Sequence, residues 1–305
     1  MNVFHHDCYD ITLGPFDRLH PFDGRKYSTV QRALHALGIA TRPVAGPVPP
    51  AALDAFAGEI LRPLYASKRY VLRALEVPYI PLLPFGLVDR RILRPMRWAV
   101  QGTIQAAEAA LQGHVAWNLS GGYHHASRNA AEGFCIYNDV GIAVQDLRGR
   151  GLLGAHDRIQ IVDVDAHHGN GNAHVFLKEP GVQILDIYNG DLYPRSPTTR
   201  RRVDIGVPLP SGTSGADYLV RLREGLEQLT AGARLAFVIA GTDVLASDPL
   251  GRLGLSVAQC AERDRLVLGR LRQLGVPAVF LAGGGYGRQS AQAMVAGIAA
   301  CRDLA

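Results

Sequence analysis

The 305-residue sequence contains only four cysteines, and no two of them form a C-x-x-C pair. This scarcity argues against a disulfide framework and against a cysteine-ligated metal. No continuous apolar segment reaches the ~18 residues that a membrane span needs. The first ten residues, MNVFHHDCYD, also lack the basic region followed by an apolar region that marks a secretory signal. We therefore expect a cytoplasmic protein without a membrane span.

Lysine is also scarce, since it occurs only at Lys26, Lys68 and Lys178. The net charge of +5 is mild for this length. The densest basic run, at residues 200–202, has no aromatic residues among its arginines, and we interpret it as a solvated loop or the start of a strand. The composition therefore predicts no nucleic-acid partner.

Apolar residues make up 48% of the chain, which is ample for a sizeable core, and after residue 98 they alternate between helical and strand patterns. Helical patterns cover residues 99–111, 139–147, 216–229 and 257–274. Short continuous apolar runs predict buried strands at residues 114–120, 158–165, 182–188, 235–241 and 277–283. Residues 40–52 are predicted to be a surface connection, and residues 77–88, with three prolines, an irregular core segment. This pattern predicts an α/β fold, with a mostly parallel sheet flanked by helices on both faces, in a single domain spanning residues 1–305.

Polar or glycine-rich sequence follows each predicted strand. The segments are SGGYHH, DAHHGNG, DIYNGDLY, GTDVLASDP and GGGYG. In open parallel sheets the carboxyl ends of the strands face the ligand crevice. We therefore expect these five segments to meet in one site.

Carboxylate and imidazole side chains in this set have the character of metal ligands. Asp165 and His167 are two residues apart, so they point to the same side if the strand extends through them, and Asp163 shares that side. Asp243, after another buried strand, is the natural third ligand. Three protein ligands leave coordination positions open, as in catalytic sites, and nitrogen and oxygen donors admit zinc, iron(II) or manganese, of which we favour zinc. Helix capping is the alternative role of such aspartates, but several unpaired buried carboxylates would be costly without a cation.

Two histidines and a tyrosine complete the predicted chemistry. His124 and His125 follow a glycine turn, and a histidine suits the role of a base at neutral pH. GGGYG lacks the spacing of a phosphate-binding loop, so we expect its glycines to bring Tyr286 to the site, where the hydroxyl could stabilise an oxyanion. The alternative is a tyrosine packed over the sheet edge with its hydroxyl in water. The other tandem pair, His5 and His6, has no such context and is not predicted to be catalytic.

The motifs NLSGGYHHA, EGFCIYND, IVDVDAHHGNG, AGTDVLASDP and LAGGGYG resemble, in their order, those of the zinc-dependent histone deacetylase family of the arginase/deacetylase superfamily. Residues 18–27 and 82–97 are similar to the class IV branch in particular, so the resemblance covers nearly the whole chain. It implies the arginase/deacetylase fold and the hydrolytic removal of acetyl or longer fatty acyl groups from lysine, in a protein or a peptide.

The resemblance also implies roles for single residues. His125 would be the general base, with His124 assisting electrostatically. The implied zinc ligands are Asp165, His167 and Asp243, and the implied catalytic residues are His124, His125, Asp163, Asn170 and Tyr286. The implied substrate-binding residues are Gly133, Phe134, Tyr193, Leu250 and Gly284. Asp163 and Asp186 fall where family members hold a potassium ion.

Two positions depart from the common pattern of the family. Asn170 stands where many members have an aspartate, and because an amide stabilises an imidazolium less than a carboxylate does, His125 should be more readily neutral. The class IV branch shares this asparagine. Asp186 replaces a common serine, which leaves the ligands of the potassium ion open. His168 stands where that branch has glutamine, and we expect it to be structural.

Three other functions are alternatives to lysine deacylation. An arginase-like site with two manganese ions needs further carboxylates, and Gly169 and Leu245 occupy their positions. A small-molecule substrate such as an acetylpolyamine stays open, and it would favour acidic residues at the rim of the site. A catalytically inactive acyl-lysine binding module is the remote alternative, because every expected catalytic position is filled.

Overall fold

Parallel strands form the centre of the protein. Within residues 1–12, 23–113 and 115–304, which the computed structural model describes, eight strands form one sheet in the order β2-β1-β3-β8-β7-β4-β5-β6. All neighbouring strands pair in parallel. The strands are β1 (Asn2–His5), β2 (Arg42–Pro43), β3 (Ala116–Asn118), β4 (Ile159–Asp163), β5 (Val182–Asn189), β6 (Ile205–Leu209), β7 (Leu235–Ile239) and β8 (Ala278–Leu281). The predicted α/β fold is confirmed, and the sheet is entirely rather than mostly parallel.

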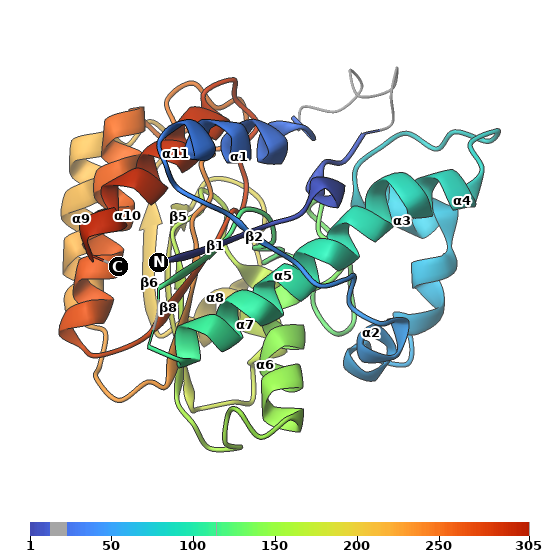
Figure 1. The fold of residues 1–305 in the computed structure, drawn as a ribbon, viewed down its shortest axis with the longest axis horizontal. Helices are drawn as coiled ribbons and strands as arrows, with labels where there is room; N and C mark the ends of the chain where they lie inside the picture. The colour runs from blue at the N-terminus through green and yellow to red at the C-terminus, as the bar shows by residue number, and fades with distance from the viewer. Residues whose placement is uncertain (13–22, 114, 305) are drawn as a thin grey trace.

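Helices cover both faces of this sheet (Figure 1). One side carries α1 (Lys26–Ala36), α9 (Gly215–Glu227), α10 (Val257–Gln273) and α11 (Ser290–Ala300), and the other carries α5 (Arg94–Leu111) and α6 (Asp139–Gly149). The shorter helices are α2 (Pro50–Phe56), α3 (Lys68–Ala74), α4 (Phe85–Val88), α7 (Asn170–Val175) and α8 (Pro197–Arg202), with η1 (Asp7–Tyr9), η3 (Arg62–Ala66), η4 (Asp89–Leu93) and η5 (Arg302–Leu304). No helix in the described residues combines the length and the apolar character that a bilayer span requires.

Side-chain caps set the starts of the long helices close to where the sequence places them. Asn138 accepts a hydrogen bond from the Gly141 N–H at the start of α6. Ser256 forms a capping box with Gln259 at the start of α10. These side chains satisfy N–H groups that have no partner in the first helical turn. The predicted helices therefore begin and end within a few residues of the observed ones, apart from α5, which begins five residues earlier.

Residues 40–52 are not the simple surface connection that was predicted. Arg42 and Pro43 form β2, which pairs with β1 at the edge of the sheet, and α2 begins at Pro50. Val44 and Val48 are buried in the core. Proline is tolerated in this strand because only one side of an edge strand carries ladder hydrogen bonds.

Residues 77–84 are irregular, as predicted, but residues 85–88 form the helix α4, and most of the segment 77–88 does not lie in the core. The side chain of Leu82 is 94% exposed, and Tyr79 is also exposed. Three prolines remove N–H donors from this stretch, and the ammonium of Lys68 donates instead to the carbonyls of Ile80, Pro81 and Leu83. The chain becomes helical at Phe85 and stays so through α4, η4 and α5.

The arginine run at residues 200–202 is neither a loop nor a strand start. It forms the last turn of α8, whose first turn is capped by Ser196. Arg202 donates to the carbonyls of Phe176, Glu179 and Val182. Two of the three arginines, Arg200 and Arg202, are therefore used for internal hydrogen bonds. Residues 18–22 of the class IV-like segment, and His114 of the predicted strand 114–120, lie outside the described residues.

A buried arginine ties the ends of two central strands to a helix, and its loss should destabilise the fold. Arg263 in α10 is fully buried, pairs with Asp264, and donates to the carbonyls of Val164 and Gly241. Because Arg263→Met leaves a buried carboxylate unpaired, we expect it to lower the free energy of unfolding by about 3–5 kcal/mol in urea titrations. The matched variant Arg221→Met, in an exposed ion pair, should change it by less than about 1 kcal/mol. Equal stability of the two variants would contradict this assignment.

Candidate active site

The polar segments converge at the carboxyl ends of the central strands, as their order in the sheet requires. β4 ends at Asp163, two residues before the predicted end, so Asp165 and His167 belong to the following loop. Carboxylates hold this loop in place. Asp163 accepts a hydrogen bond from the Asp165 N–H (3.3 Å), and Asp165 accepts one from the His167 N–H (3.0 Å). These bonds replace the strand ladder, and they still bring the predicted ligands to one place.

Asp165, His167 and Asp243 form a cluster whose ligand atoms all lie within 4.8 Å of one another. Nδ1 of His167 is 2.9 Å from Oδ2 of Asp243 and 3.3 Å from Oδ1 of Asp165. Ligand atoms at such separations fit around an ion at the ~2.0–2.2 Å that zinc prefers for nitrogen and oxygen. The residues present therefore fit a divalent cation with one imidazole and two carboxylate ligands.

The electrostatics of this cluster also favour a cation. Asp165 and Asp243 are fully buried. Burial, and then the negative charge of Asp165, raises the pKa of Asp243 to about 6. The glycines beside the cluster allow this crowding, because a Cβ on Gly241 would lie 2.0 Å from Oδ2 of Asp165. A divalent ion would offset the repulsion between the two carboxylates.

The two adjacent histidines have different partners and therefore different charges. Nδ1 of His124 lies 2.8 Å from Oδ2 of Asp163, and Nδ1 of His125 lies 2.7 Å from Oδ1 of Asn170. Burial alone would lower the pKa of His124, but the negative charges of Asp163 and Asp165 outweigh it and raise the pKa to about 9. Burial, and then the charges of neighbouring histidines, lowers the pKa of His125 well below its usual range. His125 is therefore the neutral member of the pair and can accept a proton.

Tyr286 is presented by a loop that an aspartate holds. Oδ2 of Asp248 accepts hydrogen bonds from the N–H groups of Tyr286 (2.7 Å) and Gly287 (3.0 Å). The ring of Tyr286 packs edge-on against Phe134, with 5.6 Å between the ring centroids. Burial, and then the charges of Asp243 and Asp165, raises the pKa of the phenol well above its usual range. The hydroxyl therefore stays protonated and can donate a hydrogen bond.

These groups open into one pocket of about 270 Å³. It is lined by Glu76, His125, Gly133, Phe134, His167, Leu192, Tyr193, Pro249, Leu250, Arg252 and Tyr286. Four of the five expected substrate-binding residues are on this wall. The fifth, Gly284, lies against the metal-ligand cluster instead, where its N–H donates to Oδ2 of Asp165 (2.7 Å).

The turn that forms one wall needs glycine. Gly133 and Phe134 both have positive φ angles, of 56° and 65°. A Cβ on Gly133 would lie 2.4 Å from Cδ2 of His125. The turn can therefore approach the base closely only because residue 133 has no side chain.

Asp186 lies beside Asp163 in the register of β5 and β4. Its Oδ2 lies 2.6 Å from Nδ1 of His168 and accepts a hydrogen bond from the Gly169 N–H (3.0 Å). Nε2 of His168 lies 2.9 Å from the Thr199 hydroxyl, so both ring nitrogens of this buried histidine have partners. Oδ1 of Asp186 is buried and has no hydrogen-bond partner in the described residues.

Sequence reasoning assigned no role to several further residues at the site. Lys26 is fully buried, its ammonium donates to the Gly285 carbonyl (3.2 Å) next to Tyr286, and burial lowers its pKa to about 8. Glu132 accepts a hydrogen bond from the Asn170 amide (2.6 Å). Both belong to segments that carry the family resemblance, but neither segment indicates which distant group the side chain contacts. Glu76 of the pocket wall had no signal in the sequence.

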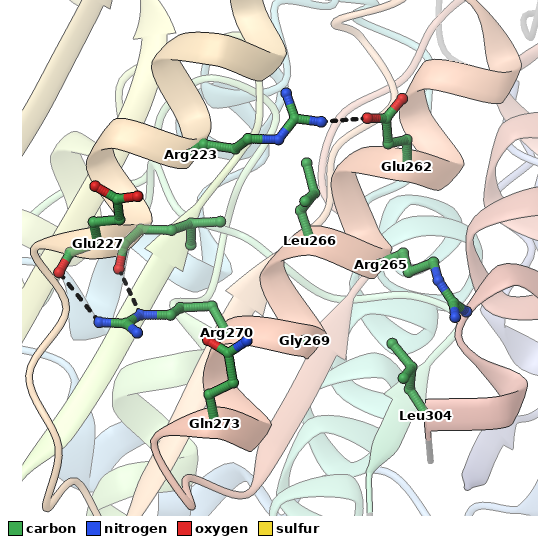
Figure 2. A pocket seen from close by; sticks show the side chains of 10 residues that line it. Arg223, Glu227, Glu262, Arg265, Leu266, Gly269, Arg270, Gln273 and Leu304 are labelled. Atoms are coloured by element: carbon green, nitrogen blue, oxygen red, sulfur yellow. Dashed lines mark hydrogen bonds and ion pairs between the residues drawn. The ribbon is translucent and has the colours of Figure 1, made fainter.

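A larger cavity, of about 470 Å³, is lined by residues of α9, α10 and η5 (Figure 2). All four of its arginine and glutamate side chains other than Glu227 have partners, among them Arg265 with Asp303. Arg223 pairs with Glu262, and Arg270 donates to the carbonyls of Leu226 and Glu227. Because neither the metal-ligand cluster nor the histidine pair lines this cavity, we place the chemistry in the smaller pocket.

Solved structures show that this arrangement of strands and helices is a known α/β fold. An acetylpolyamine aminohydrolase from Burkholderia pseudomallei matches with a TM-score of 0.72 and 21% identity, over 98% of both chains. An HDAC homologue from Aquifex aeolicus matches with a TM-score of 0.74 and 22% identity, over 99% of this chain and 83% of its own length. At this identity the matches show the fold alone.

Sequence comparison gives the family. The model of the histone deacetylase domain matches residues 85–301. Histone deacetylase 2 of Arabidopsis thaliana is 33% identical over 297 residues, which is 96% of this chain and 76% of that protein. The chain belongs to the histone deacetylase family, and the resemblance found in its motifs is confirmed at the level of the family.

Proposed function

We propose that the protein is a zinc-dependent amidohydrolase that removes acetyl or longer acyl groups from lysine side chains. One observation carries this proposal. A single pocket contains His167 of the metal-ligand cluster, the neutral His125 and the protonated hydroxyl of Tyr286. The family supports hydrolysis of this kind. Similarity of residues 82–97 to the class IV branch supports membership of that branch.

The bound metal would polarise the carbonyl of the scissile amide and make a water molecule more acidic. His125 would accept a proton from this water as its oxygen attacks the carbonyl carbon, and would deliver it to the amine when the C–N bond breaks. Tyr286 would donate a hydrogen bond to the carbonyl oxygen as negative charge develops there. His124, kept protonated by Asp163, would add positive charge behind the base.

The pocket wall supports a substrate with an extended apolar stem. Phe134 and Leu250 supply apolar surface, and Tyr193, 46% exposed, stands at its opening. This shape fits the methylene chain of an acyl-lysine in a protein or a peptide.

Glu76 favours the second candidate, an acetylpolyamine or a related small acylated amine, because an acidic group on the wall attracts a cationic substrate.

A substrate panel would separate these candidates. Zinc-loaded protein is assayed for product amine with acetyl-, octanoyl- and myristoyl-lysine peptides and with acetylpolyamines. We expect at least one lysine peptide to exceed every polyamine in kcat/KM by about tenfold or more, which corresponds to ~1.4 kcal/mol. Higher kcat/KM for polyamines would favour the second candidate, and Glu76→Gln should then raise their KM. Binding of the peptides without turnover would favour the inactive module.

The compartment and the second ion belong to the same proposal. All four cysteines are free thiols, and three of them are buried, which supports a reducing compartment such as the cytoplasm.

The buried Oδ1 of Asp186, which has no hydrogen-bond partner in the described residues and lies beside Asp163, supports a potassium ion next to the catalytic metal. Its coordination would differ from a site with serine at this position, since His168 and Gly169 already occupy the other oxygen.

A further inference from the structure

Glu132 is linked to the proposed base through one intervening side chain. Its carboxylate accepts a hydrogen bond from Nδ2 of Asn170 (2.6 Å), and Oδ1 of Asn170 lies 2.7 Å from Nδ1 of His125. The backbone of Glu132 is fixed by two hydrogen bonds with Cys135, of 3.1 Å and 3.0 Å. Asn170 stands where many family members have an aspartate next to this histidine. In this protein a carboxylate is still present, one side chain further from His125.

This arrangement determines which nitrogen of His125 carries the hydrogen. A carboxylate can only accept, so the NH₂ group of Asn170 must face Glu132. The amide oxygen of Asn170 then faces His125, and because it also only accepts, Nδ1 of His125 must be the donor. Neutral His125 consequently has its lone pair on Nε2, the nitrogen that is free to take a proton from water.

Without Glu132, nothing in these contacts distinguishes the two orientations of the Asn170 amide. The flipped amide would donate to Nδ1 of His125 and move the hydrogen of the neutral ring to Nε2, where it blocks the base. A charge-assisted hydrogen bond such as that from Asn170 to Glu132 is roughly twice as strong as a neutral one. Glu132 therefore selects the productive orientation.

Glu132 also acts on a second neighbour of His125, the ring of Tyr193. The ring of Tyr193 packs against His125, with 5.5 Å between centroids. Burial, and then the charge of Glu132, raises the pKa of the Tyr193 phenol. One carboxylate thus influences both the hydrogen-bond partner of the imidazole, Asn170, and one of the rings that pack beside it, Tyr193.

Glu132 lies outside the substrate pocket. Together with Asn170 it lines a separate cavity of about 370 Å³ on the other side of Tyr193. His125 and Tyr193 line the substrate pocket, but Glu132 and Asn170 do not. Glu132 therefore acts through other residues and does not contact the substrate.

We propose that Glu132 is a positioning residue that orients the Asn170 amide and thereby holds His125 in the Nδ1–H tautomer. The expected effect of Glu132 on the reaction rate rests on the proposed function, in which His125 is the base. The expected effect of Glu132 on the tautomer of His125 does not depend on that function. An experiment can therefore contradict one of these effects without contradicting the other.

The test compares Glu132→Gln, Glu132→Leu and the double variant Glu132→Leu/Asn170→Asp in the full chain. Glutamine can still accept through its amide oxygen, so Glu132→Gln should keep kcat within about tenfold. Glu132→Leu should lower kcat by about 10–100-fold, the usual effect of a supporting hydrogen-bond partner, with KM within about twofold. In the double variant the carboxylate introduced at position 170 accepts directly from Nδ1 of His125, and kcat should recover to within about tenfold of the wild type.

Nitrogen-15 NMR of labelled histidine reports the tautomer without reference to activity. The His125 signals, assigned by their loss in His125→Gln, should show a protonated Nδ1 in the wild type and the double variant, and a mixture of tautomers in Glu132→Leu. Full kcat in Glu132→Leu, or an unchanged tautomer in that variant, would overturn the proposal. So would failure of Asn170→Asp to restore kcat in a Glu132→Leu background with wild-type thermal stability. If the wild type hydrolyses no acyl amide, the NMR result still decides the positioning role.

Discussion

Tyr286→Phe should lower kcat by about 10²–10³-fold while the protein stays folded. One hydrogen-bond donor to a developing oxyanion is typically worth ~3–4 kcal/mol. The substitution removes only the hydroxyl, and the ring keeps its edge-on contact with Phe134. The loop also stays in place, because Asp248 holds it through the backbone N–H groups of residues 286 and 287.

Steady-state kinetics on the best acyl-lysine peptide, together with a thermal unfolding curve, would measure this effect. The loss should fall on kcat, because the interaction strengthens only as charge develops on the carbonyl oxygen. Tyr79→Phe is the matched control, since Tyr79 is exposed and lies outside the pocket wall. A Tyr286→Phe variant with more than half of the wild-type kcat would exclude the oxyanion role.

Asp243→Asn should abolish both stoichiometric metal binding and turnover. The change removes one of two negative charges from a three-residue ligand set, and an amide is a much weaker ligand than a carboxylate. Elemental analysis should find one divalent ion per wild-type chain, and a chelator should remove it together with the activity. Added zinc should restore the bound ion and the activity of the wild-type protein. Bound zinc should also raise the melting temperature of the wild type, since it binds the folded chain.

Metal affinity should also depend on pH. Metal binding needs deprotonated ligands, and in the metal-free protein the pKa of Asp243 is raised to about 6 by burial and by the charge of Asp165. As the pH falls below about 6, a proton must be displaced from Asp243, so the apparent affinity should fall. Asp146→Asn, in an exposed ion pair with Arg150, should leave stoichiometry and affinity unchanged. Absence of a stoichiometric ion from the wild type would rule out the proposed chemistry.

The strand pattern and the polar segments after the strands were the most predictable part of the molecule. Runs such as IQIVD and LAFVI are buried at every position, and only a sheet covered on both faces accommodates them. Parallel strands leave their carboxyl ends on one edge, so the meeting of His125, Asp165 and Asp243 follows from the order of the segments. The two-residue strand β2 could not be predicted, because Arg42 and Pro43 have no strand pattern and only pairing with β1 orders them.

The exposed segment at residues 77–88 shows another limit. Its apolar composition indicates burial, but its prolines leave carbonyls that require donors, and these come from Lys68 of α3. A local pattern does not include such a partner. The same is true of Gly284, whose place against Asp165 depends on a contact between residues 119 positions apart.

The amino-acid sequence by itself determined the α/β class and the family, and it supplied the proposed site residues, because these depend on local periodicity and on motifs whose order is preserved. The tertiary structure alone decided how those residues are supported. The hydrogen bond from Asn170 to Glu132 joins residues 38 positions apart, and that from Lys26 to Gly285 joins residues 259 positions apart. Side chains so distant in the chain meet only after the sheet is assembled, and short motifs hold no information on which of them will be neighbours.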